Sequence, residues 1–256
     1  MIFENTDKDW EKFGKNDPYF GVVTHETFSG DDLNDEQLGR FFASGKEYID
    51  IVCSNINKYL NIEFKPRTSL DFGCGVGRLL IPISKISEKA VGIDVSSSML
   101  SEAKTNIKKY NISNTELILS SDCEEIVSRS FDFIHSFIVF QHIPVKRGFE
   151  IYKKLLGSLN SNGVGVLHFT FFNPSLHGVR GLLNKYVPFA RIFKNIIKGR
   201  KFNAPDMQMN EYDVNELLNV LCENGIKNLF LEFTEHDGIS GIVVYFKKIS
   251  EIQTGS

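Results

Sequence analysis

The chain has 256 residues, of which 42% are hydrophobic and 24% are charged, and its formal net charge is −3 at pH 7. These values predict a folded α/β domain with extensions rather than a disordered chain. The small negative charge gives no indication of nucleic-acid binding.

The four cysteines are scattered without a Cys-x-x-Cys pair, which argues against a metal site or a disulfide framework. The N-terminal residues lack the apolar core of a signal peptide. The longest apolar stretches, of about ten residues, are too short to span a bilayer. We therefore expect a cytoplasmic protein without a metal, and the sequence leaves its oligomeric state open.

Residues 1–65 are predicted to form an N-terminal extension. Apolar residues recur at helical spacing from Leu38 to Tyr59, which predicts one helix. The aromatic stretch DPYFGVVT at residues 17–24 precedes this helix and is expected to be a loop.

From residue 66 to the end, short apolar runs alternate with helical patterns, which predicts a parallel sheet with helices on both faces. Strands are expected at 68–73, 90–95, 115–120, 131–140 and 164–172. Helices are expected at 76–86, 96–110, 144–160 and 211–223. The last two strands, at 228–236 and 241–248, are joined by a short turn, so we expect them to be antiparallel.

Residues 173–209 interrupt the alternation and form a basic insertion. They hold seven Lys or Arg residues against the single acid Asp206, which gives a charge of +6. The remaining residues therefore carry −3 − 6 = −9. Three interpretations stay open: a cover that binds an anionic acceptor, a helix that touches an anionic membrane, and an ordinary lid with solvated lysines.

The stretch LDFGCGVGRLL at residues 70–80 places glycines at 73, 75 and 77, where the first strand of the sheet turns into its helix. Glycines at such a turn permit positive φ and a close approach of ligand to backbone. A dinucleotide fingerprint needs a third glycine where Arg78 stands, and no P-loop sequence is present. A tight turn without any ligand is the structural alternative.

Acidic residues follow the next two strands. Asp94 lies 21 residues after Gly73, where a carboxylate can accept two hydrogen bonds from a ribose diol. Asp122 lies at the end of the third strand, where an acid can accept from an adenine amino group. Both carboxylates are also candidates for helix capping.

Four segments, LDFGCGVGRL, VGIDVSSSML, SSDCEE and FDFIHSFIVFQHI, occur in this order between residues 70 and 143. Together they resemble the motifs of the class I S-adenosylmethionine (SAM)-dependent methyltransferase family, over roughly residues 66–172. The resemblance implies a Rossmann-like, mostly parallel sheet of seven strands with an antiparallel last strand. It also implies SAM as cofactor, bound across the carboxyl edge of the sheet.

The resemblance places the methionine part of SAM at the glycine turn, its ribose at Asp94 and its adenine against Met99. Asp122 and Cys123 would meet the adenine edge, and His135 and Ser136 would line the methyl-donor end. The expected cofactor contacts are Tyr19, Asp71, Gly73, Cys74, Gly75, Gly77, Arg78, Asp94, Val95, Met99, Asp122, Cys123, His135 and Ser136.

Methyl transfer to a hydroxyl needs a base, and histidines are the candidates. His142, just after the fourth strand, is the first choice, followed by His168 and His135; a packing role for each is the alternative. The expected acceptor-binding residues are Tyr19, Gln141, His142, His177, Arg180 and Arg191.

The N-terminal stretches DPYFGVVT and FFASGKEYI resemble, more loosely, those of bacterial methyltransferases of capsule and O-antigen pathways. This resemblance implies that Tyr19 and Phe20 close over the cofactor. We therefore expect O-methylation of an anionic small molecule, such as a phosphorylated or nucleotide-linked sugar. Methylation of a small amine and non-catalytic binding of SAM are the alternatives, and a nucleic-acid acceptor is not expected.

Overall fold

The computed structural model describes residues 6–24, 26–28, 30, 33–177 and 207–249. Most of the basic insertion, including Arg180 and Arg191, therefore lies outside the described residues. Within these ranges no helix is both long and apolar enough to cross a membrane.

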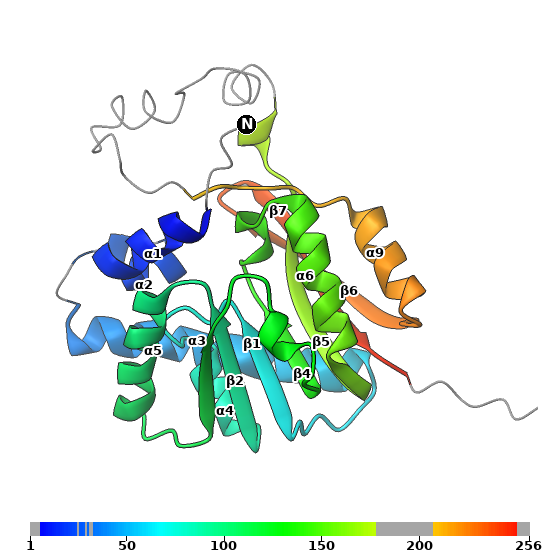
Figure 1. The fold of residues 1–256 in the computed structure, drawn as a ribbon, viewed down its shortest axis with the longest axis horizontal. Helices are drawn as coiled ribbons and strands as arrows, with labels where there is room; N and C mark the ends of the chain where they lie inside the picture. Colours follow the sequence, from blue (N-terminus) through cyan, green and yellow to red (C-terminus); the bar gives the residue numbers. More distant parts are fainter. Residues whose placement is uncertain (1–5, 25, 29, 31–32, 178–206, 250–256) are drawn as a thin grey trace, which may run out of the picture.

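A seven-stranded sheet forms the centre of the fold, with the strand order β3-β2-β1-β4-β5-β7-β6 (Figure 1). The strands β1 to β5 are parallel, and β7 is antiparallel to both β5 and β6. This arrangement confirms the Rossmann-like prediction. The strands are β1 Thr68–Phe72, β2 Lys89–Asp94, β3 Thr115–Leu119, β4 Phe131–Ser136, β5 Leu159–Phe172, β6 Asn228–His236 and β7 Ile239–Lys247.

Two apolar cores cover the two faces of the sheet. One core joins α3 Asp35–Tyr59, α4 Leu80–Lys85 and α5 Ser97–Lys109 to one face. The other core joins α6 Val145–Gly157 and α9 Val214–Glu223 to the opposite face. Short 3₁₀ turns lie at η1 Glu26–Phe28, η2 Glu124–Ile126, η3 Phe140–His142 and η4 Pro174–Leu176.

Helix α3, in the N-terminal extension, is part of the main core. Asn34 and Gln37 form a capping box at its start. Its apolar face buries Phe41, Ile49 and Val52 in the core that also covers the sheet. At Gly45 the helix passes so close to the glycine turn that an added Cβ would lie 2.4 Å from the carbonyl oxygen of Arg78.

The N-terminal segment differs most from the prediction. Residues 6–22 form two helices, α1 Thr6–Asn16 and α2 Pro18–Val22. The sequence predicts a loop at residues 17–24 and no helix before it. Trp10 and Phe13 pack against the core, and an added Cβ at Gly14 would lie 2.5 Å from Ser96 Oγ. Tertiary packing on α5 therefore decides the structure of this mixed, acidic segment.

Three boundaries also differ. Helix α4 starts at Leu80, because the left-handed glycine turn occupies the preceding residues. Strand β4 stops at Ser136, because Ile138 adopts a positive φ of 59°. Strand β5 starts at Leu159, since Leu159 pairs with Phe131, so the expected helix of residues 144–160 ends at Gly157.

Candidate functional site

A cavity of about 260 Å³ opens at the carboxyl edge of the sheet. The ends of β1, β2, β4 and β5 form its floor, and the start of β7 forms one wall. Helices α1 and α2 contribute Thr6, Asp7, Trp10, Gly21 and Val22, so the N-terminal extension covers the cavity. The expected cofactor residues that line it are Gly73, Gly75, Asp94, Val95 and Met99.

The glycine turn has the backbone that the sequence predicts. Gly73, Gly75 and Gly77 have φ of +75°, +51° and +88°, a region that side chains rarely adopt. A Cβ at Gly73 would lie 2.4 Å from Val139 Cγ2, and one at Gly75 would lie 2.7 Å from Val22 Cγ2. The turn therefore forms a cradle that any side chain would fill.

Asp94 joins the glycine turn to the start of α5. Its Oδ2 accepts from the backbone N–H of Gly75 at 2.8 Å, and its Oδ1 accepts from that of Ser96 at 2.9 Å. Each oxygen keeps a second lone pair, so the carboxylate can also accept from a diol. Burial raises the pKa of Asp94 to about 6, against hydrogen bonds that lower it. The cap of α5 itself is Ser96, whose Oγ accepts from Met99 N–H.

A second, smaller cavity of about 40 Å³ lies behind the turn and is lined by Asp71, Gly73, Cys74 and Arg78. The Nε of Arg78 is buried without a hydrogen-bond partner. Arg78 Nη1 donates to Ser44 Oγ at 3.3 Å, so Nε is the unsatisfied donor. A carboxylate and this unsatisfied N–H at one small cavity match the ammonium and carboxylate of an amino acid. These residues, with the cradle and Asp94, fit the groups of SAM. Gly77 lines neither cavity.

His135 and Ser136 do not reach the cavity, contrary to the prediction. Both are fully buried, and His135 Nδ1 lies 2.9 Å from Asp71 Oδ1. His135 is the register partner of Asp71 on the neighbouring parallel strand, so their side chains share a face of the sheet. The next residues, Phe137, Ile138 and Val139, line the cavity instead.

Tyr19 and the third-strand residues are also placed differently. The Tyr19 hydroxyl donates to Glu102 on α5 at 2.6 Å, so it holds α2 rather than pointing into the cavity. Asp122 is exposed, and Cys123 is buried in the core beside α6. Ser120 and Ser121 line the cavity at the place predicted for Asp122 and Cys123.

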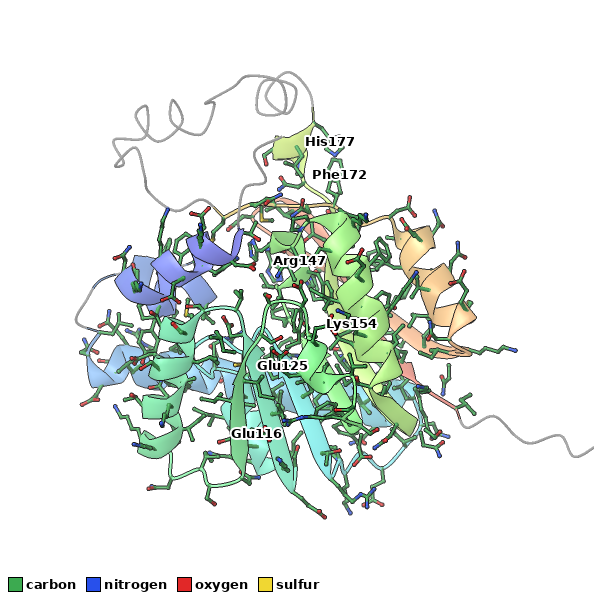
Figure 2. All side chains as sticks on the ribbon, in the orientation of Figure 1. Glu116, Glu125, Arg147, Lys154, Phe172 and His177 are labelled. Carbon is green, nitrogen blue, oxygen red and sulfur yellow. The ribbon has the colours of Figure 1, made fainter. Side chains whose placement is uncertain are left out.

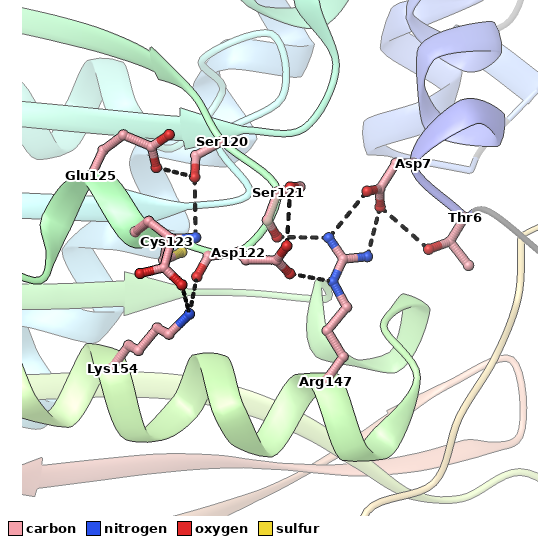
Figure 3. A network of polar contacts seen from close by, with 10 residues as sticks. Thr6, Asp7, Ser120, Ser121, Asp122, Cys123, Glu125, Arg147 and Lys154 are labelled. Carbon is pink, nitrogen blue, oxygen red and sulfur yellow. Dashed lines mark hydrogen bonds and ion pairs between the residues drawn. The ribbon is translucent and has the colours of Figure 1, made fainter. Parts of the chain in front are cut away.

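Arg147 on α6 joins α1, in the roof of the cavity, to the segment after β3 (Figure 3). Its Nη1 and Nη2 lie 2.8 and 3.1 Å from the two carboxylate oxygens of Asp7 on α1. Its Nε donates to Asp122 at 2.7 Å, and Nη2 donates to the carbonyl of Ser121 at 2.7 Å. Arg147 has no sequence signature of this role, because its partners lie 25 to 140 residues away along the chain.

Glu11, in the middle of α1, joins this helix to the start of α5. Its carboxylate accepts from the hydroxyls of Ser96 and Ser98 at 2.8 and 2.7 Å and from Ser98 N–H at 3.2 Å. Burial alone would raise the pKa of Glu11, but the hydrogen bonds from Ser98 and Ser96 lower it to about 2. The carboxylate is ionised at neutral pH and lies at the N-terminus of α5, where the helix dipole favours an anion.

Replacing Arg147 with alanine is expected to loosen α1. We expect faster hydrogen exchange in residues 6–16 and affinity for SAM lowered about threefold to tenfold, since a partly exposed ion-pair network contributes roughly 1 kcal/mol. Arg129→Ala is the matched control, because Arg129 pairs with Glu116 at 2.8 Å and lies outside the cavity lining. Unchanged exchange in α1 of the Arg147 variant would show that the pair does not hold the roof.

His142 lies in the cavity wall with both ring nitrogens engaged. Nδ1 lies 2.8 Å from the carbonyl oxygen of Gln208, and Nε2 lies 3.2 Å from Nε2 of Gln141. Burial lowers the pKa of His142 to about 4, so the ring is neutral at pH 7. The Gln141 carbonyl accepts from Asn210 N–H at 2.7 Å. Gln141 and His142 therefore anchor residues 208–210, where the chain continues from the basic insertion towards α9.

His168 lies on β5 and lines the same cavity. It is 2% exposed, its Nε2 lies 3.0 Å from Thr234 Oγ1, and its Nδ1 has no hydrogen-bond partner. Burial, with smaller contributions from His236 and His142, lowers the pKa of His168 to about 3. Of the histidines predicted to act in catalysis, His168 alone combines a place at the cavity with an unsatisfied nitrogen.

His177 lies outside both cavity linings, against the exposed Phe172 (Figure 2). Its Nε2 lies 2.8 Å from Glu211 Oε1, which also accepts from the Asn173 N–H. This pair joins residues 173–177 to residue 211, so the two ends of the insertion meet beside the cavity. In the described ranges, no three His, Cys, Asp or Glu side chains gather as metal ligands.

Comparison with known proteins supports the fold and the cofactor region. Residues 70–163 match the sequence model of a family described as methyltransferase domain. A probable cobalt-precorrin-6B C(15)-methyltransferase (decarboxylating) of Methanococcus maripaludis is 41% identical over 69 residues, which are 27% of this chain and 37% of that protein. The chain thus aligns with little more than a third of the length of this curated relative.

Among solved structures, magnesium protoporphyrin IX methyltransferase from Synechocystis PCC 6803 with bound S-adenosylhomocysteine (SAH) has a TM-score of 0.60 at 16% identity. The match covers 93% of this chain and 97% of that one. The N-methyltransferase NodS of Bradyrhizobium japonicum WM9, in complex with SAH, has a TM-score of 0.58 at 12% identity and covers 96% and 99% of the two chains. The described part of the chain therefore has the fold of SAM-dependent methyltransferases.

Proposed function

We propose that this chain is a SAM-dependent methyltransferase that acts on a small-molecule acceptor. One observation carries the proposal: a left-handed glycine cradle and the carboxylate of Asp94 line the same cavity as His168. The methyltransferase-domain match at residues 70–163 covers the cradle and Asp94, and it also supports the proposal.

SAM supplies a methyl group on a sulfonium, and the leaving thioether needs no proton. The chain therefore has to bind, orient and exclude water. Asp94 binds the ribose hydroxyls, and Asp71 and Arg78 bind the ammonium and carboxylate of the methionine part. Trp10, Gly21 and Val22 cover the cavity from above, which keeps water from the reacting groups.

The acceptor lies in the part of the cavity formed by β4, β5 and β7. Aromatic and apolar side chains, including Phe137, Met209 and Ile239, surround it, and His168 and Thr170 are polar groups on its floor. Because the pKa of His168 is about 3, the ring is a weak base at neutral pH. We therefore assign His168 to hydrogen bonding and orientation of the acceptor through Nδ1, and His142 to anchoring residues 208–210.

For the acceptor we propose a hydroxyl on an anionic small molecule, such as a phosphorylated or nucleotide-linked sugar of capsule or surface polysaccharide biosynthesis. The +6 charge of residues 173–209 supports an anion, since the ends of this segment meet beside the cavity. Arg147 is the only Lys or Arg of the large-cavity lining among the described residues, and Asp7 and Asp122 already pair with it.

A small amine is the second candidate acceptor. The carboxylate of Asp237 and the rings of Trp10 and Phe137 line the cavity. Acids and aromatic faces bind cations, so these side chains favour an amine. A transfer assay with SAM labelled in its methyl group distinguishes an amine acceptor from an anionic acceptor. Phosphorylated sugars, nucleotide-linked sugars and aromatic amines are tested in parallel.

The assay includes the Asp94→Ala variant as a control for transfer that depends on the cofactor site. Transfer to a sugar phosphate or a nucleotide-linked sugar, lost in that variant, would support the leading proposal. Transfer to amines alone would replace it with N-methylation. SAM binding without transfer to any class would favour a non-catalytic SAM-binding protein.

Two substitutions of His168 test its assignment. Asparagine keeps a polar atom near the position of Nδ1, whereas glutamine keeps one near Nε2. We expect His168→Gln to lower kcat/KM for the acceptor at least tenfold, because a lost hydrogen bond costs about 1.5 kcal/mol, and His168→Asn to retain more activity. Affinity for SAM, measured by calorimetry, should change less than about twofold in both. Equal losses in the two variants would show that Nδ1 has no special role.

A further inference from the structure

Strand β4 is connected to η3 by Phe137, Ile138 and Val139. Ile138 has φ of +59°. The other described non-glycine residues with positive φ are Asn61, Asn111, Asn162, Asp237 and Cys123. Asparagine and aspartate tolerate this region, but a β-branched side chain is a genuine outlier there. Such strain persists only where the surrounding structure imposes it, and it concentrates at functional sites.

The strained residue lies at the boundary of the two cavities. Ile138 lines both the large cavity and the small one that holds Asp71 and Arg78. Its side chain is half-buried. It therefore belongs to the wall between the region assigned to the methionine part of SAM and the region assigned to the acceptor.

The left-handed backbone also sends the two flanking side chains to opposite faces of the sheet. Residues two apart on a regular strand share a face. Here Phe137 packs in the core on the α3 face, with ring centroids 4.3 Å from Tyr48 and 5.1 Å from His168. Val139 packs against the core on the α6 face and sits over Gly73.

From this placement we infer that Ile138 is a positioning residue for methyl transfer. Its left-handed backbone fixes Val139 against the glycine cradle and Phe137 against His168, so one residue sets the spacing of cofactor and acceptor. The inference rests on the proposed function, because it assumes that SAM occupies the cradle.

The strain is tested by comparing glycine and alanine at one position. Both substitutions remove the side chain, but only glycine tolerates positive φ. We expect the ligand-free Ile138→Gly protein to melt at a higher temperature than Ile138→Ala. At Val139, which has a φ of −111°, the alanine variant should instead melt at a higher temperature than the glycine variant. Asn111→Gly, at a remote left-handed residue, should change little.

The positioning role is tested by calorimetry with SAM and SAH, which needs no acceptor. We expect Ile138→Gly and Ile138→Ala to bind both at least fivefold more weakly than the unmodified chain, because the wall loses its fixed conformation. Ile138→Val, which keeps a β-branched side chain, should bind within about twofold, and so should Asn111→Gly.

The outcomes separate this inference from the proposed function. Weaker binding in the glycine and alanine variants, together with the reversed order of melting temperatures, supports it. Unchanged binding in variants of a chain that does bind SAM would overturn the role of Ile138 alone. If the unmodified, folded chain binds neither SAM nor SAH, the proposed function fails and this inference fails with it.

Discussion

Replacing Asp94 with alanine is expected to lower the affinity for SAM about 100-fold or more. Two hydrogen bonds from a ribose diol to a carboxylate contribute together about 3 kcal/mol, and each 1.4 kcal/mol is a factor of ten. The variant also leaves the N–H groups of Gly75 and Ser96 without their acceptor, which disturbs the cradle. Calorimetric titration with SAM measures the effect.

Asp213→Ala is the matched control for this variant. Asp213 caps α9 by accepting from Glu216 N–H at 3.0 Å and does not line the cavity. Its loss should cost about 1 kcal/mol of stability without changing affinity for SAM. If both variants bind SAM as the unmodified chain does, Asp94 only joins the glycine turn to the start of α5 and is not a ribose ligand.

The pKa of Asp94 predicts a dependence on pH. Burial raises this pKa from 3.8 to about 6, so the folded chain holds the proton more tightly than the unfolded chain. Stability from this group is therefore present below pH 4 and is lost as the pH rises through 6. The affinity for SAM has the opposite trend, because the ionised carboxylate of Asp94 accepts hydrogen bonds from the ribose diol. We expect affinity about tenfold lower at pH 5 than at pH 7.

Replacing Gly73 with alanine is expected to destabilise the protein and abolish binding of SAM. The left-handed φ of +75° costs alanine about 1–2 kcal/mol, and the contact of 2.4 Å with Val139 Cγ2 adds about 1–3 kcal/mol of overpacking. Thermal unfolding and calorimetry measure the two effects. Gly39→Ala is the control, because Gly39 lies in α3 with open space around it and should gain about 0.5–1 kcal/mol.

A double substitution separates the two costs at Gly73. Val139→Ala removes both methyl groups that the new Cβ would meet, but it does not change the backbone. Gly73→Ala with Val139→Ala should therefore recover part of the stability and little of the binding. Full recovery of binding would show that the contact, and not the left-handed backbone, makes glycine necessary.

Local sequence was sufficient for the glycine turn and Asp94, but not for the expected cofactor contacts Tyr19, Asp122, Cys123, His135 and Ser136, which line neither cavity. The glycine spacing and the acid after the second strand predicted the cradle and Asp94, because residues close in sequence form both. The mostly parallel sheet and its antiparallel last strand followed from the alternation of elements and from the resemblance. The N-terminal helices α1 and α2 were missed, since their stability comes from packing on α5 rather than from their own composition.

The other expected cofactor contacts and the acceptor half could not be predicted as well, for physical reasons. In a mostly apolar run such as FDFIHSFIVF the alternation of faces is not visible, so the pairing of His135 with Asp71 gave no signal. The left-handed Ile138 has no sequence signature, because its side chain disfavours the conformation it adopts. The partners of Arg147 and Tyr19 are distant in the chain and depend on the fold.

Calorimetric titration of the unmodified chain with SAM, with SAH and with NAD tests the central claim most directly. The claim is that the glycine cradle and Asp94 bind a sulfonium nucleoside. We predict micromolar binding of SAM and SAH, in agreement with the shape and acidity of the cavity, and no binding of NAD. Binding of NAD, or of none of the three by a folded chain, would contradict it.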